Sequence, residues 1–144
     1  MSQENKAAVR RFIALLNEKR LADLGDVCDE DFVFRGSGGL ADVHGLGAFK
    51  QTLQSFFDAF PDLEDTIEDM IAEGDLVAGR FTARGTHQGD FAGVSPTGTR
   101  VSFQGINMYR VRDGKIVEEW FQEDLLGLMQ QLRAISAPGR PSAN

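Results

Sequence analysis

Residues that could take part in acid–base chemistry lie in the hairpin around Asp113 and Gly114. Glu119 and Asn107 are polar residues within strand-like segments of this hairpin. If Glu119 faces a closed pocket, burial raises its pKa and makes it a candidate general acid or base, with Asn107 orienting the substrate. If it faces outward, the two residues form an ordinary solvated pair. The side of the sheet decides between these interpretations.

The turn of the hairpin sets that side. A three-residue turn, Arg112-Asp113-Gly114, places Asn107 opposite Glu119 and puts Phe121 on the same face. A two-residue Asp113-Gly114 turn shifts the pairing by one residue and brings Trp120 to the face of Asn107 instead. The sequence leaves both registers open.

His87 is a second candidate for proton transfer. It ends an apolar strand, so its imidazole could exchange protons at the rim of a pocket near neutral pH. Alternatively, the ring hydrogen-bonds the loop 89–98 and fixes its conformation. The other histidine, His44, lies in a loop before a helix, where we expect a surface role.

An acidic segment near the middle of the chain superficially resembles a metal site. Strand alternation spreads its side chains over both faces, and no histidine or fixed loop accompanies them, so we predict no metal. Most should lie on a solvated strand surface. Asp69 is the exception, because it shares a face with Leu63, Ile67 and Ile71. The segment comprises Glu64, Asp65, Glu68, Asp69, Glu73 and Asp75.

Composition excludes several classes of partner. The formal net charge of −7 opposes binding to nucleic acid or to an anionic membrane. The single Cys28 cannot form an intrachain disulfide, and no apolar run approaches 18 residues. We therefore expect a cytoplasmic protein. Gly36–Ala41 matches a dinucleotide-binding pattern by letter, but no strand–helix–strand unit follows it, so no nucleotide cofactor is predicted.

Hydrophobic periodicity predicts helices first and long strands afterwards. Val9, Phe12, Ile13 and Leu16 have helical spacing, and Pro61 ends a second helix. The predicted helices cover 2–20, 46–60 and 125–134, with a short one at 21–27, and the predicted strands cover 31–35, 63–73, 77–88, 99–111 and 115–123. This order indicates one α+β domain over residues 1–137, followed by a disordered tail at 138–144.

Several motifs together resemble the SnoaL-like polyketide cyclase family, part of the nuclear transport factor-like superfamily. They are Gly85–Phe91 around His87, Pro96–Gly98, Arg110–Ile116, Glu118–Trp120 and Leu126–Leu132. The resemblance implies an α+β cone-shaped barrel, with N-terminal helices packed in the concave face of a strongly curved antiparallel or mixed sheet. It also implies a hydrophobic pocket and a homodimer.

The best-known members of that family close a polyketide ring by intramolecular aldol condensation, without metal or cofactor. Their general acid/base is an aspartate directly after the tryptophan, and this chain has Phe121 there, which cannot transfer a proton. The family often has a further aspartate four residues after the tryptophan. Asp124 is therefore a candidate cavity acid, a candidate cap of the following helix, or both.

These observations favour a cofactor-independent enzyme that acts by general acid/base chemistry, as a cyclase or isomerase, on a small hydrophobic carbonyl, ester or polyketide-like molecule. The alternatives are a non-catalytic binding module of the same fold and a dimeric accessory protein with a vestigial pocket. Trp120 is either a core residue or a ligand platform. The candidate catalytic residues are Asp124, Glu119 and His87, and the candidate substrate-binding residues are Asn107, Phe121, Trp120, Phe57 and Phe60.

We expect the protein to form a homodimer through the exposed face of its sheet, because a long antiparallel sheet with helices on one side leaves the other side uncovered. Sedimentation at micromolar concentration measures this directly. A single species of 15.8 kDa, the mass of one chain, would contradict it.

Overall fold

The computed structural model describes residues 2–134, so the predicted tail at 138–144 and the domain limit at 137 lie outside the described residues. The helices are α1 (Ser2–Asn17), the 3-10 helix η1 (Leu21–Asp26), α2 (Leu46–Ala59) and α3 (Leu125–Gln131). The strands are β1 (Cys28–Arg35), β2 (Val43–His44), β3 (Glu64–Glu73), β4 (Leu76–Thr86), β5 (Arg100–Arg112) and β6 (Lys115–Trp120).

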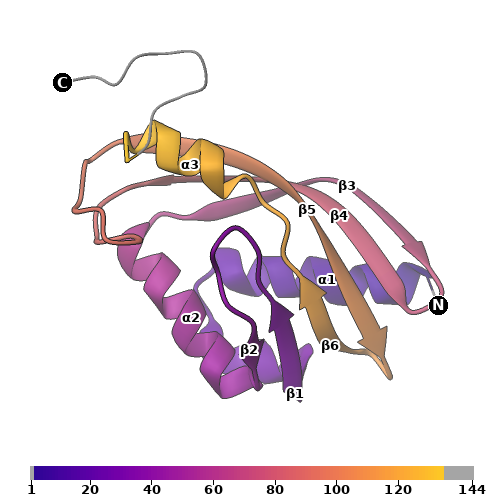
Figure 1. The fold of residues 1–144 in the computed structure, drawn as a ribbon. Coiled ribbons are helices and arrows are strands. Elements are labelled where there is room, and N and C mark those ends of the chain that lie inside the picture. The colour runs from indigo at the N-terminus through magenta and orange to yellow at the C-terminus, as the bar shows by residue number, and fades with distance from the viewer. Residues whose placement is uncertain (1, 135–144) are drawn as a thin grey trace.

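The strands form one mixed six-stranded sheet in the order β2-β1-β6-β5-β4-β3. Among the strands of residues 2–134, only the β1–β6 pair is parallel, and the other neighbours are antiparallel. Figure 1 shows the long strands β3, β4 and β5 arching over α1 and α2, which lie on the concave side. This architecture confirms the predicted α+β fold. None of the described helices combines the length and apolar character that crossing a membrane requires.

Phenylalanine rings join the two long helices to the sheet. Phe49 of α2 lies 4.6 Å from Phe32 and 5.4 Å from Phe34, both of β1, and 6.2 Å from Phe12 of α1, measured between ring centroids. All four side chains are buried. The helical spacing of apolar residues in α1 and α2 thus produces a continuous aromatic core under the sheet.

The ends of the helices follow local backbone rules. The α2 helix ends at Ala59, since Phe60 precedes Pro61 and adopts an extended conformation (φ −132°). The α1 helix ends at Asn17, earlier than the predicted Arg20, because Lys19 takes a left-handed conformation (φ 58°).

A β-bulge reverses the alternation within β3. Ile67 pairs with Phe81 but Asp69 pairs with Arg80, so one extra residue separates the two halves of the strand. Ile67 packs against the core, whereas Ile71 is 72% exposed and Asp69 forms an ion pair with Arg80 on the solvent side. The prediction that Asp69 shares a face with Leu63 and Ile67 is therefore wrong.

A second bulge shifts the register of the β5–β6 hairpin by one residue from the pairing that its turn alone would give. The turn is the two-residue type, with Asp113 and Gly114 both at positive φ (51° and 77°) and Arg112 opposite Lys115. Val111 then pairs with Ile116 and Arg110 with Glu118, so Val117 is the extra residue. Tyr109 consequently lies opposite Glu119, and Glu119 shares the face of Asn107.

We expect Phe49→Ala to lower the free energy of unfolding by about 3 kcal/mol or more, because it leaves a cavity among several rings. Leu126→Ala is the control, since Leu126 of α3 is largely exposed. Urea unfolding of both variants provides the measurement. A loss of stability in Phe49→Ala no larger than that in Leu126→Ala would show that the aromatic cluster does not stabilise the core.

Candidate active site

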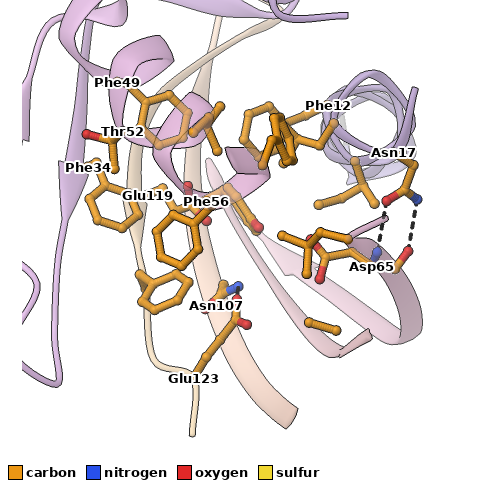
Figure 2. Close-up of a pocket in the computed structure, with 18 of the residues that line it drawn as sticks. Phe12, Asn17, Phe34, Phe49, Thr52, Phe56, Asp65, Asn107, Glu119 and Glu123 are labelled. Carbon is orange, nitrogen blue, oxygen red and sulfur yellow. Dashed lines mark hydrogen bonds between the residues drawn. The ribbon is translucent and has the colours of Figure 1, made fainter. Parts of the chain in front are cut away.

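A pocket opens between α1, α2 and the concave face of the sheet (Figure 2). It measures about 700 Å³ when the space open to solvent is included. Its wall is mainly apolar, and its polar groups come from the sheet and from the helix surfaces that face it. It is lined by Phe12, Ile13, Leu16, Asn17, Phe34, Phe49, Thr52, Leu53, Phe56, Phe57, Leu63, Asp65, Ala83, Phe103, Asn107, Tyr109, Glu119, Phe121 and Glu123.

Glu119 reaches this pocket from β6 and is only 5% exposed. It lies opposite Tyr109 of β5, whose side chain is fully buried. Phe121 lines the same pocket two residues further on and packs against Phe34, 5.4 Å away between ring centroids. The residue after the tryptophan, Phe121, therefore forms part of the apolar wall of the pocket. The carboxyl group of Glu119 lies two residues earlier on the same face.

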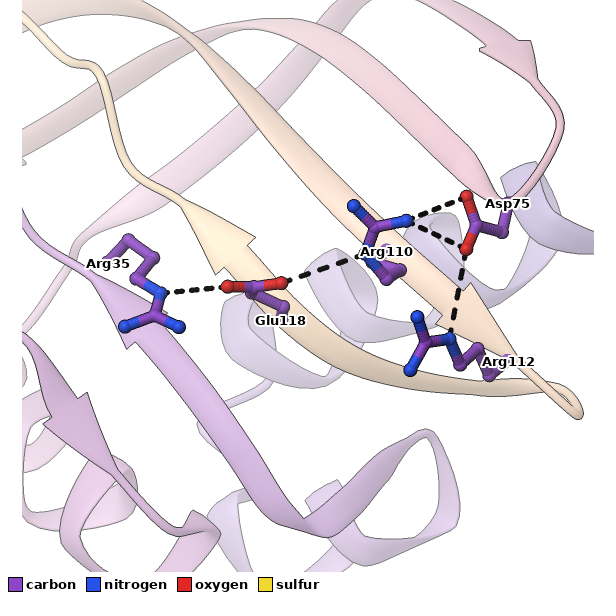
Figure 3. Close-up of polar contacts among 5 residues, drawn as sticks. All are labelled: Arg35, Asp75, Arg110, Arg112 and Glu118. Carbon is purple, nitrogen blue, oxygen red and sulfur yellow. Dashed lines mark hydrogen bonds and ion pairs between the residues drawn. The ribbon is translucent and has the colours of Figure 1, made fainter.

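Glu118 directly precedes Glu119, and ion pairs on the opposite face of the sheet hold its side chain there (Figure 3). Glu118 Oε2 accepts a hydrogen bond from Arg35 Nε (2.8 Å), and its Oε1 lies 3.7 Å from Arg110 Nε. Arg110 Nη1 also donates to both carboxylate oxygens of Asp75, at 3.0 and 2.8 Å. Because these contacts hold Glu118 on the outer face, strand alternation directs Glu119 inward.

Asn107 and Glu123 form a second polar group in the pocket. Asn107 Nδ2 donates to Glu123 Oε2 (2.7 Å), and Asn107 Oδ1 accepts from the backbone N–H of Gln122 (2.9 Å). Gly105 makes this arrangement possible, because a Cβ there would stand 2.2 Å from Cγ of Glu123 and 2.6 Å from the carbonyl oxygen of Gln122. The segment after β6 can therefore pass close to β5 and present Glu123.

Asp65 of β3 supplies a third carboxyl group, from the α1 side of the pocket (Figure 2). The sequence contained a signal for it, since Asp65 stands two residues from both Leu63 and Ile67 and therefore shares their inward face. Our sequence interpretation instead singled out Asp69, which the bulge turns outward. Among the described residues, no three His, Cys, Asp or Glu side chains are grouped so that they could hold a metal ion.

The apolar wall changes the acidity of these groups. The pKa of Glu119 is raised to about 8: burial is the largest cause, the charges of Glu123 and Asp65 add to the rise, and a hydrogen bond with the Tyr109 hydroxyl opposes it. Burial likewise raises the pKa of Glu123 to about 7 and that of Asp65 to about 6. Burial, followed by the charge of Glu119, raises the pKa of Tyr109 well above its usual value.

His87 lies outside the pocket and organises the loop that follows β4. Its ring is fully buried, and Nδ1 accepts a hydrogen bond from the backbone N–H of Thr97 (3.2 Å) and lies 3.0 Å from Thr97 Oγ1. Its backbone carbonyl also accepts from Gly98 N–H (2.9 Å). This position favours the interpretation in which His87 fixes the 89–98 loop.

The other predicted site residues divide between the pocket and its surroundings. Asp124 caps α3, accepting a hydrogen bond from Gly127 N–H (2.8 Å), and it is not among the residues that line the pocket. Trp120 is half-buried on the outer face beneath the Arg110 guanidinium, 5.6 Å from the ring centroid. Phe57 lines the pocket, whereas the buried Phe60 packs against His87, 5.5 Å away between ring centroids.

We expect Glu119→Gln to gain stability relative to the wild type as pH rises from about 5 to about 8.5. The unfolded carboxyl ionises near its ordinary pKa of 4.5 and the folded one near 8, so the folded state holds the extra proton over this interval. Wild-type stability therefore falls as pH rises, and the glutamine variant lacks this contribution.

Urea unfolding at both pH values checks this expectation. The difference between variant and wild type should shift in favour of the variant, by about 4 kcal/mol. Glu68→Gln, at an exposed position of β3, is the control. An equal difference between variant and wild type at the two pH values would show that Glu119 does not titrate in this way.

Comparison with known proteins agrees with this geometry. Residues 6–132 match the family model of the SnoaL-like polyketide cyclases. Aklanonic acid methyl ester cyclase AcmA of Streptomyces galilaeus is 28% identical over 131 residues, 90% of each chain. The structure of AclR, a candidate hydroxylase from Streptomyces galilaeus, is 32% identical with a TM-score of 0.84, covering 98% of this chain and 87% of its own. IdmH of Streptomyces antibioticus, a candidate polyketide cyclase, is 32% identical with a TM-score of 0.77, covering 89% and 97%. The chain therefore belongs to the SnoaL-like polyketide cyclase family.

Proposed function

We propose that this protein is a cofactor-independent enzyme of the cyclase type, which moves protons on a small hydrophobic carbonyl compound, with Glu119 as a general acid/base. The observation that carries this proposal is a carboxyl group that faces an aromatic pocket from β6 and is almost completely buried. Such a group can touch a ligand directly. Of the three catalytic candidates named from the sequence, Glu119 alone lines the pocket.

The raised pKa of Glu119 suits this role. A general acid or base works best when its pKa lies near the working pH, because both protonation states are then accessible. An apolar pocket keeps the Glu119 carboxyl protonated near neutrality and strengthens its interaction with a substrate oxygen. Asn107, fixed by its bonds to Gln122 and Glu123, is suited to orienting the same substrate.

The wall of the pocket supports a ring-bearing substrate. Phenylalanines from both long helices, from β1 and β5 and from the segment after β6 line it, and flat rings pack well against such surfaces. The relative AcmA is named for the cyclisation of aklanonic acid methyl ester. We therefore propose a polyketide-like ester or ketone as the substrate class.

The competing proposal is a binding module that holds such a ligand without converting it. Phe121 favours it, since it lines the pocket at the position where the resemblance leads one to expect an acid. Glu119, on the same face, favours the enzyme. A ligand that binds but never exchanges protons would decide for the binding module.

We also propose that a second copy of this chain covers the outer face of the sheet, as predicted from the sequence. Ile71 and Ile106 are 72% and 59% exposed, although residues of this type are usually buried. Burying them against another chain would remove this apolar surface from water.

We expect the wild type to close the ring of aklanonic acid methyl ester, or to exchange the acidic C–H protons of related aromatic β-keto esters with solvent deuterium. Glu119→Gln should slow these reactions roughly 100- to 10,000-fold, because an amide cannot transfer the proton. Chromatography with mass spectrometry follows both reactions.

Glu68→Gln is the control, since Glu68 lies at an exposed position of β3 and does not line the pocket. Thermal melting confirms that both variants fold. Full activity of folded Glu119→Gln would exclude Glu119 as the acid/base. Tight binding without any exchange by the wild type would favour the binding module.

A further inference from the structure

Asp65 and Glu119 face the pocket from different parts of the same sheet face. Asp65 lies on β3, the edge strand, and Glu119 lies on β6. Strand β3 is separated from β6 by β5 and β4, and the sheet curves between them (Figure 1). Asp65 and Glu119 nevertheless line the same pocket. Figure 2 shows Asp65 beside α1, with Glu119, Asn107 and Glu123 on the other side of the pocket. A ligand in this pocket therefore lies between carboxyl groups.

The side chain of Asn17 holds the backbone of Asp65 in place. Asn17 Nδ2 donates to the carbonyl oxygen of Asp65 (2.9 Å), and the Asp65 N–H donates to Asn17 Oδ1 (2.8 Å). Because β3 is an edge strand, these backbone groups have no further strand beside them, and the amide of Asn17 takes that place. These two hydrogen bonds hold the Asp65 backbone from which the carboxyl group projects.

Asp65 lines the pocket, and its Oδ1 atom is buried without a hydrogen-bond partner, so it is suited to a ligand. Leaving such a group unsatisfied costs about 1–3 kcal/mol, so an unpaired polar atom that lines a pocket calls for a functional explanation. A substrate that offers a proton to Asp65 would supply the missing partner.

The charged surroundings keep Asp65 more acidic than Glu119. Lys19 is the nearby cation, and it lowers the pKa of Asp65 against the larger effect of burial, while Glu119, Glu123 and Tyr109 face the pocket from the other strands. Lys19 itself donates to the carbonyl of Leu63 and lies over the ring of Phe57, 4.7 Å from its centroid. Near neutral pH, an ionised Asp65 can thus coexist with a protonated Glu119.

We propose that Asp65 is a second catalytic residue of this pocket: it removes a proton from the carbon next to a substrate carbonyl, while Glu119 gives its proton to that carbonyl oxygen. This inference rests on the proposed function and adds to it a division of labour between two carboxyl groups. Asn17 is then a positioning residue for the base.

The proposed cycle needs no other reactant. In the first step the C–H bond breaks, its proton goes to the Asp65 carboxylate, and the carbonyl oxygen takes the Glu119 proton, so an enol forms. In the second step the enol carbon bonds to a second carbonyl carbon of the same molecule. The oxygen of that carbonyl takes the proton from Asp65, and the enol oxygen returns its proton to Glu119. Both residues recover their starting states, and the product is an isomer of the substrate.

The test compares Asp65→Asn with Asp69→Asn, its matched control on the outer face of the same strand. The probes are aklanonic acid methyl ester and aromatic β-keto esters in deuterium oxide. We expect Asp65→Asn to lose C–H exchange and ring closure roughly 100- to 10,000-fold and Asp69→Asn to match the wild type. Asp65→Glu, which keeps a carboxyl group, should retain more exchange than Asp65→Asn, and it provides a second variant should the amide fail to fold.

The pH profile of exchange separates a catalytic from a structural role. In the wild type the rate should rise with pH through about 6, as Asp65 ionises, and fall through about 8, as Glu119 loses its proton. The residual activity of Asp65→Asn should lack the rise on the acidic side. A structural role would leave the shape of the profile unchanged.

The outcomes distinguish this inference from the proposed function. An active wild type, an inactive Glu119→Gln and a fully active Asp65→Asn would overturn the role of Asp65 and leave the proposed function standing. A wild type without exchange or closure on any probe would overturn both.

Discussion

Side chains alternate between the two faces of β6, so the choice of which glutamate faces the pocket depends on a single residue of register. The tight Asp113-Gly114 turn alone would direct the other set of side chains inward, and the bulge at Val117 reverses this. The ion pairs of Glu118 with Arg35 and Arg110 reinforce the choice on the outer face. The position of the Glu119 carboxyl in the pocket therefore depends on a bulge at Val117, which does not itself line the pocket.

The pocket and the hydrophobic core are built from the same side chains. Phe12, Phe34 and Phe49 belong to the main buried cluster and also line the pocket. Their packing stabilises the fold, and the apolar surface they expose raises the pKa values of the carboxyl groups nearby. Burying Asp65, Glu119 and Glu123 in one pocket lowers the stability of the folded protein, and the packing of the aromatic core offsets this loss.

Much of the fold could be predicted from hydrophobic periodicity and a few strong breakers. Pro61 located the end of α2, and the long alternating segments located β3 to β6. The candidate site was harder to predict, because the alternation of apolar and polar residues in a sequence does not reveal where a bulge reverses the face to which the side chains point. Asp69 appeared to share a face with Leu63 and Ile67, but the bulge after Ile67 turned it outward and left Asp65 as the inward acid. Asn17 carried no signal at all, since its role arises from a contact between residues far apart in the sequence.

The alternation that places Glu119 and Glu123 on either side of Phe121 has a consequence for how such a site can change. Positions two residues apart on a strand are separated by about 6.6 Å, which exceeds the width of one aromatic ring. Moving a carboxyl group by one such step would bring it next to a different carbon of a bound polycycle, while the sheet and helices stay as they are. Chains with this fold could in this way come to form different bonds in similar ring systems, through substitutions along one row of side chains.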